Sequence, residues 1–114
     1  MITIIRTIVI SSLIFCGTQQ NDQKACNIFN EHLNIIRKRI EKVPDLKIAD
    51  ISSSILFLEN ITLIKSKSDG NIYGRFNPTQ DDFKKWSNWF KANKSRIYWD
   101  ASEEKVKLKG VSLN

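Results

Sequence analysis

The chain has 114 residues, of which 41% are hydrophobic and 26% are charged. This size and composition predict one globular domain with one hydrophobic core, and they exclude collagen-like, low-complexity and fully disordered chains. Two cysteines and one histidine are too few for a disulfide scaffold, for a zinc site with four thiolate ligands or for a zinc site with two histidines.

The net charge is +6, from 18 Lys and Arg against 12 Asp and Glu. A basic balance is typical of proteins that bind nucleic acid or an anionic membrane. Lysine outnumbers arginine 13 to 5, whereas nucleic-acid recognition favours the bidentate contacts of arginine. The charge therefore does not favour nucleic acid as the partner, and a basic single-stranded nucleic-acid-binding protein is kept as the alternative function.

The N-terminus is typical of an export signal. Arg6 precedes an apolar run from Thr7 to Phe15, which is shorter than the ~20 residues needed to span a bilayer. We expect residues 1–15 to be a signal peptide, residues 16–24 a flexible tether and residues 25–114 a single domain. The alternatives are a protein that is secreted or is retained by an uncleaved signal, and a cytosolic protein. A buried N-terminal strand or helix would make Cys16 a small core residue.

The end of this apolar run, Leu13-Ile14-Phe15-Cys16, resembles the lipobox of bacterial lipoproteins. In that family a signal peptidase cuts before a cysteine, which becomes diacylated. Phe15 stands where a small residue is usual. The resemblance implies lipidation at Cys16 and an exported, membrane-anchored protein on the periplasmic or outer face rather than in the cytoplasm.

A first helix is predicted from Ala25 to Val43, with Pro44 ending it. Its apolar stripe steps by 4, 3, 4 and 3 through Phe29, Leu33, Ile36, Ile40 and Val43. Cys26 leads the same stripe, so we expect a buried, inert thiol.

A second helix is predicted after Asp50, which is a good N-cap residue. Because Ile55–Leu58 is apolar on every side, we expect this helix to be the most buried element, with Glu59-Asn60 as its polar edge. Lys65 to Asn77 is predicted to be an ordered surface loop pinned by Ile72, Tyr73 and Phe76, with a β-hairpin at Asp69-Gly70 as the alternative.

A third helix is predicted to begin at Thr79, whose side chain can form a capping box with Asp82, and to end near Lys94. The β-favouring Arg96–Trp99 and the alternating Lys105–Lys109 then predict a two-stranded hairpin with Val106 and Leu108 facing the helices. The expected fold class is α+β and mostly helical, with about three helices and a short C-terminal β-hairpin.

All three tryptophans of the chain fall within 14 positions, from Trp86 to Trp99. Aromatic residues can stack on bases, grip sugars or anchor a protein interface. Their helical spacing predicts Trp86 and Trp99 in the core and Trp89 partly exposed. The candidate interaction surface is Trp89 and Tyr98 with the cations Lys85 and Arg96.

The residues Trp86, Trp89, Phe90, Asn93, Ile97, Trp99 and Asp100 form a pattern that resembles the end of HEAT-like helical repeat units and of small uncharacterised exported bacterial proteins. The resemblance covers about 15 residues. It implies paired antiparallel helices in an interaction scaffold. At these positions Asn93 is expected to cap the helix C-terminus, and Asp100 to accept hydrogen bonds from the following turn.

Candidate catalytic residues are few. His32 lies beside the apolar stripe and is expected to be half-buried, while Asp81 and Asp82 are better explained as helix-capping acids. We expect no catalytic residue, no metal site and no cofactor, with an enzyme that uses Asp100 or His32 as a third reading. The predicted function is a non-enzymatic, exported, lipid-anchored module that binds a protein partner in the cell envelope, for which an inhibitor or immunity role fits the size.

Overall fold

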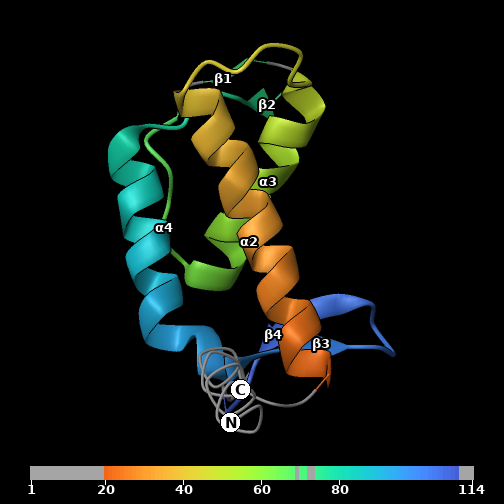
Figure 1. Cartoon of the computed structure of the whole chain (residues 1–114). Coiled ribbons are helices and arrows are strands. Elements are labelled where there is room, and N and C mark those ends of the chain that lie inside the picture. The colour runs from red at the N-terminus through yellow and green to blue at the C-terminus, as the bar shows by residue number, and fades with distance from the viewer. Residues whose placement is uncertain (1–19, 69, 72–73, 111–114) are drawn as a thin grey trace, which may run out of the picture.

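The computed structural model describes residues 20–68, 70–71 and 74–110. Helix α2 stands at the centre, with α3 and α4 beside it, and the β3–β4 hairpin lies across the end where α2 begins (Figure 1). This arrangement confirms the predicted α+β, mostly helical fold. The elements are α2 (Gln20–Ile40), α3 (Ile48–Thr62), β1 (Gly70–Asn71), β2 (Gly74–Arg75), α4 (Gln80–Asn93), the 3-10 helix η2 (Lys94–Arg96), β3 (Ile97–Asp100) and β4 (Lys105–Leu108).

The start of α2 corrects the predicted tether. The signal segment, Cys16 and residues 16–19 lie outside the described residues, but residues 20–24 are helical. Asp22 in the first turn is buried and pairs with Lys109 Nζ at 2.9 Å, and Lys24 Nζ lies 4.1 Å from the centre of the Trp99 ring. These partners come from the far end of the chain, so the local sequence could not reveal them.

The helix boundaries differ at two further places. Helix α2 ends at Ile40 rather than Val43, and Lys42, with φ 61°, turns the chain while Val43 N–H donates to Lys38 O at 2.9 Å. This pattern is a Schellman motif with lysine at the usual glycine position. Asp50 is not the N-cap of α3, because the helix begins one turn earlier with Lys47 as its N-cap.

The core is built around Phe29 of α2, which is fully buried. Its ring stacks on Phe90 at 4.7 Å and on Trp89 at 5.7 Å, and it meets the edge of Phe57 at 5.9 Å. Trp86 is fully buried, as predicted, and its indole N–H donates to Ile64 O at 3.1 Å. One phenylalanine thus joins α2 to both other helices.

Glu59 and Asp82 are buried carboxylates, each 1% exposed. Glu59 was expected at a polar edge; instead it forms an ion pair with Arg75 and accepts from Ser66 N–H at 2.7 Å. Asp82 forms the predicted capping box with Thr79 and also accepts from Ser66 Oγ at 2.6 Å. Glu59 of α3 and Asp82 of α4 therefore both bind the segment 63–68, which is held between the two helices.

The segment before α4 contains a short β-hairpin, as the alternative expectation proposed, in which β1 pairs antiparallel with β2. The turn is not at Asp69-Gly70, because Gly70 belongs to β1 and pairs with Arg75. Gly74 has φ +112°, and a Cβ there would lie 2.7 Å from Ser52 Oγ. Ser52 Oγ in turn donates to Arg75 O at 2.6 Å. Glycine is therefore required where β2 approaches α3. Ile72 and Tyr73 lie outside the described residues.

The predicted C-terminal hairpin is confirmed as β3 paired with β4, and Val106 and Leu108 contribute to the core, as predicted. Trp99 pairs with Val106, which is buried, and Leu108 packs against the core, whereas Trp99 is only half-buried. Asp100 accepts from Ser102 N–H at 3.0 Å, as predicted for the turn. Hydrogen bonds hold the pKa of the Asp100 carboxyl well below its usual range; the bond from Lys107 has the larger effect and the bond from Ser102 the next.

The Asp82 carboxylate predicts a measurable acid sensitivity. Burial raises its pKa, but hydrogen bonds from Ser66 and from the backbone N–H groups of Thr79 and Lys67 outweigh burial and lower it. Its stabilising contribution is therefore complete above the unfolded-state pKa of about 3.9 and is lost as pH falls through the lower folded-state pKa. Asp82→Asn should lower the free energy of unfolding by about 2 kcal/mol at neutral pH, with a smaller effect in acid.

Urea denaturation across pH measures this difference. The matched control is Asp50→Asn, since Asp50 is exposed on the first turn of α3 and should change stability by less than about 0.5 kcal/mol. Equal losses for the two variants would contradict the role given to Asp82.

Candidate interaction surface

Three of the four predicted surface residues lie along one side of α4 and its extension. Lys85 and Trp89 are one helical turn apart, and Lys85 pairs with Asp81 at 3.1 Å. Arg96 donates to Asn93 Oδ1 at 2.9 Å, and Asn93 Nδ2 donates to Trp89 O at 2.9 Å, the predicted helix cap. Each of these side chains is half-buried or exposed but already has an intramolecular contact.

The fourth predicted residue, Tyr98, lines a groove of about 530 Å³ between α3 and the β3–β4 hairpin. The groove is lined by Phe57, Asn60, Ile61, Tyr98, Lys105, Val106, Lys107 and Leu108. Its lysines are neutralised, because Lys107 pairs with Asp100 at 2.8 Å and Lys105 with Glu103 at 3.3 Å. The groove therefore offers a mostly apolar lining without a strong local charge.

Next to the groove, α3 carries an exposed face without charge. We call it the α3 outer face; its residues step by 4, 3, 4 and 3 and are Ala49, Ser53, Leu56, Asn60 and Leu63. Asn60 belongs to both this face and the groove. The two charged residues of α3 are elsewhere, since Glu59 is buried and Asp50 does not share this spacing.

Apolar exposure is concentrated at α3. Among the described residues, the exposed large hydrophobic side chains are Val43, Ile48, Leu56 and Leu63. Ile48 and Leu56 lie on α3 and Leu63 is its C-cap, whereas Val43 lies in the connection between α2 and α3. Six of the 15 residues of α3 are buried, against six of 21 in α2 and three of 14 in α4, so α3 is the most buried helix, as predicted. Leu56 is nevertheless 56% exposed, which shows that α3 also has a solvent side.

Leu63 is the most unusual residue of this face. It is 84% exposed and ends α3 with φ 61°, a left-handed conformation in which its N–H donates to Glu59 O at 2.9 Å. Glycine is favoured at such a position, because a side chain there costs about 1 kcal/mol. Leucine therefore adds backbone strain and exposed apolar surface at one site, a combination that points to function.

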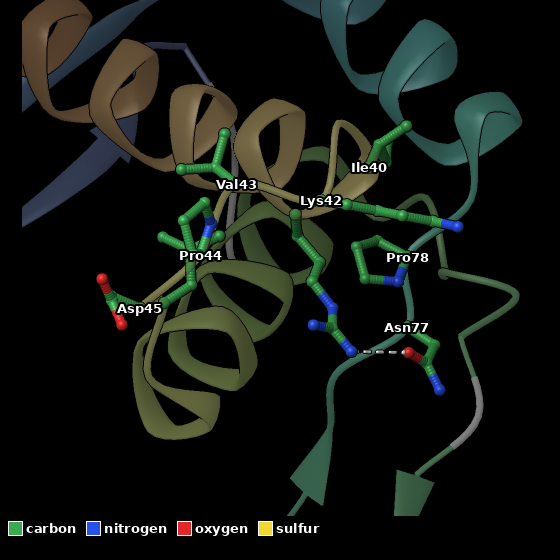
Figure 2. Close-up of a pocket in the computed structure, with 9 residues that line it drawn as sticks. Ile40, Lys42, Val43, Pro44, Asp45, Asn77 and Pro78 are labelled. Atoms are coloured by element: carbon green, nitrogen blue, oxygen red, sulfur yellow. Dashed lines mark hydrogen bonds between the residues drawn. The ribbon is translucent and has the colours of Figure 1, made fainter.

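A second hollow, of about 580 Å³, lies at the opposite end of the molecule. Val43, Pro44 and Asp45 lie on one side of it and Asn77 and Pro78 on the other (Figure 2). Arg39 spans the two segments by donating to Phe76 O and to Asn77 Oδ1, both at 3.1 Å. These two hydrogen bonds hold the end of α2 against the segment before α4, so the residues around this hollow have a structural role.

The acid–base candidates have structural contacts. His32 Nδ1 lies 2.8 Å from Ser54 Oγ, and its ring stacks on Phe57 at 4.2 Å. Burial lowers the pKa of His32, and the nearby Glu31 raises it by less. Ser54 is fully buried, so its hydroxyl cannot meet a substrate from solvent. Cys26 is buried, as predicted, and its Sγ lies 3.7 Å from Lys94 O.

In the part of the chain that the structure describes, no three His, Cys, Asp or Glu side chains gather as a metal site would require. Within the same residues, no helix has both the length and the apolar character of a membrane span. No protein-family model, curated protein or solved structure matches the chain. The resemblance of residues 86–100 to HEAT-like repeat units stays a prediction.

Leu56 and Leu63 were not among the predicted surface residues, although the sequence carries a signal for them. From Ile51 to Ile64 the only charged residue is Glu59, in a chain where a quarter of the residues are charged. A charge-free stretch at helical spacing indicates an outer face as well as a core face whenever the helix is packed on one side only.

The strain at Leu63 predicts a stabilising substitution. Leu63→Gly should raise the free energy of unfolding by about 1 kcal/mol, because glycine adopts the left-handed conformation without strain and Leu63 has little buried surface to lose. Urea denaturation is the measurement. Lys42→Gly is the control at the other left-handed helix end and should gain a similar amount. A loss of stability at Leu63→Gly alone would show that its side chain stabilises the fold.

Proposed function

We propose that the chain is an exported, lipid-anchored, non-enzymatic module that binds a protein partner in the cell envelope through the α3 outer face. The observation that carries this proposal is the pair of exposed leucines, Leu56 and Leu63, on a helix face without charge. Monomeric soluble proteins expose few contiguous apolar patches, and those they have are often binding sites.

The composition of this face fits a protein partner. The buried centre of a protein interface is depleted in charged residues, and apolar side chains there are desolvated without the cost of stripping water from an ion. The groove beside the face extends the apolar area with Phe57, Ile61 and Tyr98. The face thus supplies a ridge and the groove a hollow, which together suit an extended or helical element of another protein.

The lipid anchor is supported by the sequence at Cys16, whose preceding residues resemble a lipobox. The non-enzymatic reading is supported by the contacts of the candidate groups, since Asp100 is held by Lys107 and the turn, and His32 by Ser54 and Phe57. These contacts give each group a structural role that accounts for its placement.

Photocrosslinking in intact cells tests the binding surface. A photoreactive amino acid at position 63 should give a covalent adduct with another protein, whereas the same group at Asn88, on the exposed side of α4, should not. Leu56→Asp should reduce the adduct formed from position 63 by about tenfold or more, because it places a charge in the desolvated centre of the contact. Asn88→Asp is the matched control and should leave the adduct unchanged.

Two results would contradict the proposed surface. Equal adducts from positions 63 and 88 would show that the face has no preference for a partner. An adduct formed only with a second copy of the chain would make the face a self-association surface.

The anchor has its own test. The intact mass of the wild-type protein from the membrane fraction should correspond to a chain that begins at Cys16 and carries acyl groups, and Cys16→Ala should lose the acyl mass. A full-length, unmodified wild-type chain in the soluble fraction would contradict the anchor.

A further inference from the structure

We propose that one end of the domain lies against anionic lipid headgroups of the membrane that holds the anchor. This basic end is defined by the cations Lys24, Lys91, Lys94, Arg96 and Lys109. The inference rests on the proposed lipidation of Cys16, and it adds a second surface with a ligand of different chemistry from that of the α3 outer face.

The residues of the basic end come together because three elements meet there. The beginning of α2, the end of α4 and the β3–β4 hairpin lie at the same end of the molecule (Figure 1). Lys109 pairs with Asp22 of α2 at 2.9 Å, and Lys24 lies over the Trp99 ring of β3. Cys26 Sγ lies 3.7 Å from Lys94 O, which joins α2 to the residue after α4.

The length of chain before α2 sets the distance between this end and the membrane. Cys16 and Gln20 are four residues apart, and four extended residues span at most about 14 Å. The start of α2 therefore stays within that distance of a lipid attached to Cys16. The other end of α2 is about 30 Å further along the helix axis, so an anchored domain presents its basic end to the bilayer surface.

The charges at the two ends differ in the sense that this contact requires. Among the described residues of the basic end, Asp22 is an acid, and it pairs with Lys109. From the last turn of α4 through η2, the chain carries Lys91, Lys94 and Arg96 with no acid between them. At the opposite end, acids lie among the cations: the last turn of α2 carries Arg37, Lys38 and Arg39, and Glu41, Asp45 and Asp50 follow.

The β3–β4 turn is set apart from the basic end, because Lys105 and Lys107 pair with Glu103 and Asp100 and Glu104 adds a negative charge. Each Lys or Arg close to a membrane surface is attracted to anionic lipids, and one lipid chain together with a basic patch anchors a protein more firmly than either alone.

Two aromatic residues strengthen the assignment to lipid. Tyr98 and Trp99 are half-buried on β3 at this end, and Tyr98 borders a shallow depression with Asn21, Asp22 and Lys109. Tyrosine and tryptophan favour the boundary between water and lipid, because each joins an apolar ring to a polar group. A nucleic-acid ligand could bind the cations, but it would not require the basic end to lie close to the proposed lipid on Cys16.

Vesicle sedimentation with the unacylated full chain, Cys16→Ala, tests the basic end without the anchor. Binding to vesicles that contain phosphatidylglycerol should exceed binding to pure phosphatidylcholine vesicles and should fall with added salt. The double substitution Lys91→Glu/Arg96→Glu should reduce the partition coefficient on phosphatidylglycerol at least about tenfold. Both side chains are exposed, and the Arg96 guanidinium donates to Asn93 Oδ1 at the surface.

The matched control is Lys42→Glu/Lys47→Glu, which changes the net charge equally at the opposite, exposed end and should reduce binding much less. Equal losses for the two pairs would show a dependence on net charge alone and would overturn the basic end as a surface. The basic end would also be overturned as a lipid-binding surface if the protein showed no preference for phosphatidylglycerol. The same holds if Lys91 and Arg96 bound a single-stranded oligonucleotide while the protein did not bind vesicles. The intact mass of the wild-type protein tests the anchor separately. If the wild-type chain is acylated but the Cys16→Ala variant shows no preference for phosphatidylglycerol, this inference is refuted and the proposed function is not.

Discussion

The structure depends on two buried carboxylates that face one short segment. Glu59 and Asp82 come from different helices, yet both accept hydrogen bonds from Ser66. Such groups are costly to bury unless every oxygen has a partner, so the backbone of residues 63–68 must follow one path between α3 and α4. That path carries Ile64 O to the indole of Trp86 and brings α4 beside α2, where Trp89 and Phe90 cover Phe29.

The sequence predicted those features whose partners lie within a few residues. The apolar stripe of α2, the Thr79–Asp82 capping box, the Asn93 cap and the turn at Asp100 depend on spacings of two to four residues. It did not predict features whose partners are remote. Glu59 is buried because Arg75 and Ser66 reach it from later in the chain, and the first turn of α2 is ordered by contacts with Lys109 and Trp99.

The α3 outer face was missed for a different physical reason. An apolar helix can be surrounded by its own chain or by another molecule, and the sequence pattern is the same in both cases. The described residues form three α-helices and two small hairpins, and these elements leave the face around Leu56 open. Leu63 favours the second case, because an apolar side chain that is 84% exposed at a left-handed position adds little to the stability of its own fold.

The two surfaces have compatible positions. Helix α3 runs antiparallel to α2 and ends towards the basic end, so Leu63 lies nearer the membrane than Ala49 when the domain is anchored. In the proposed anchored arrangement, a partner held at the same membrane would be confined with this domain to one surface. Confinement raises the effective concentration of two proteins, which would let the small uncharged face around Leu56 and Leu63 serve as the proposed binding site without a large buried area.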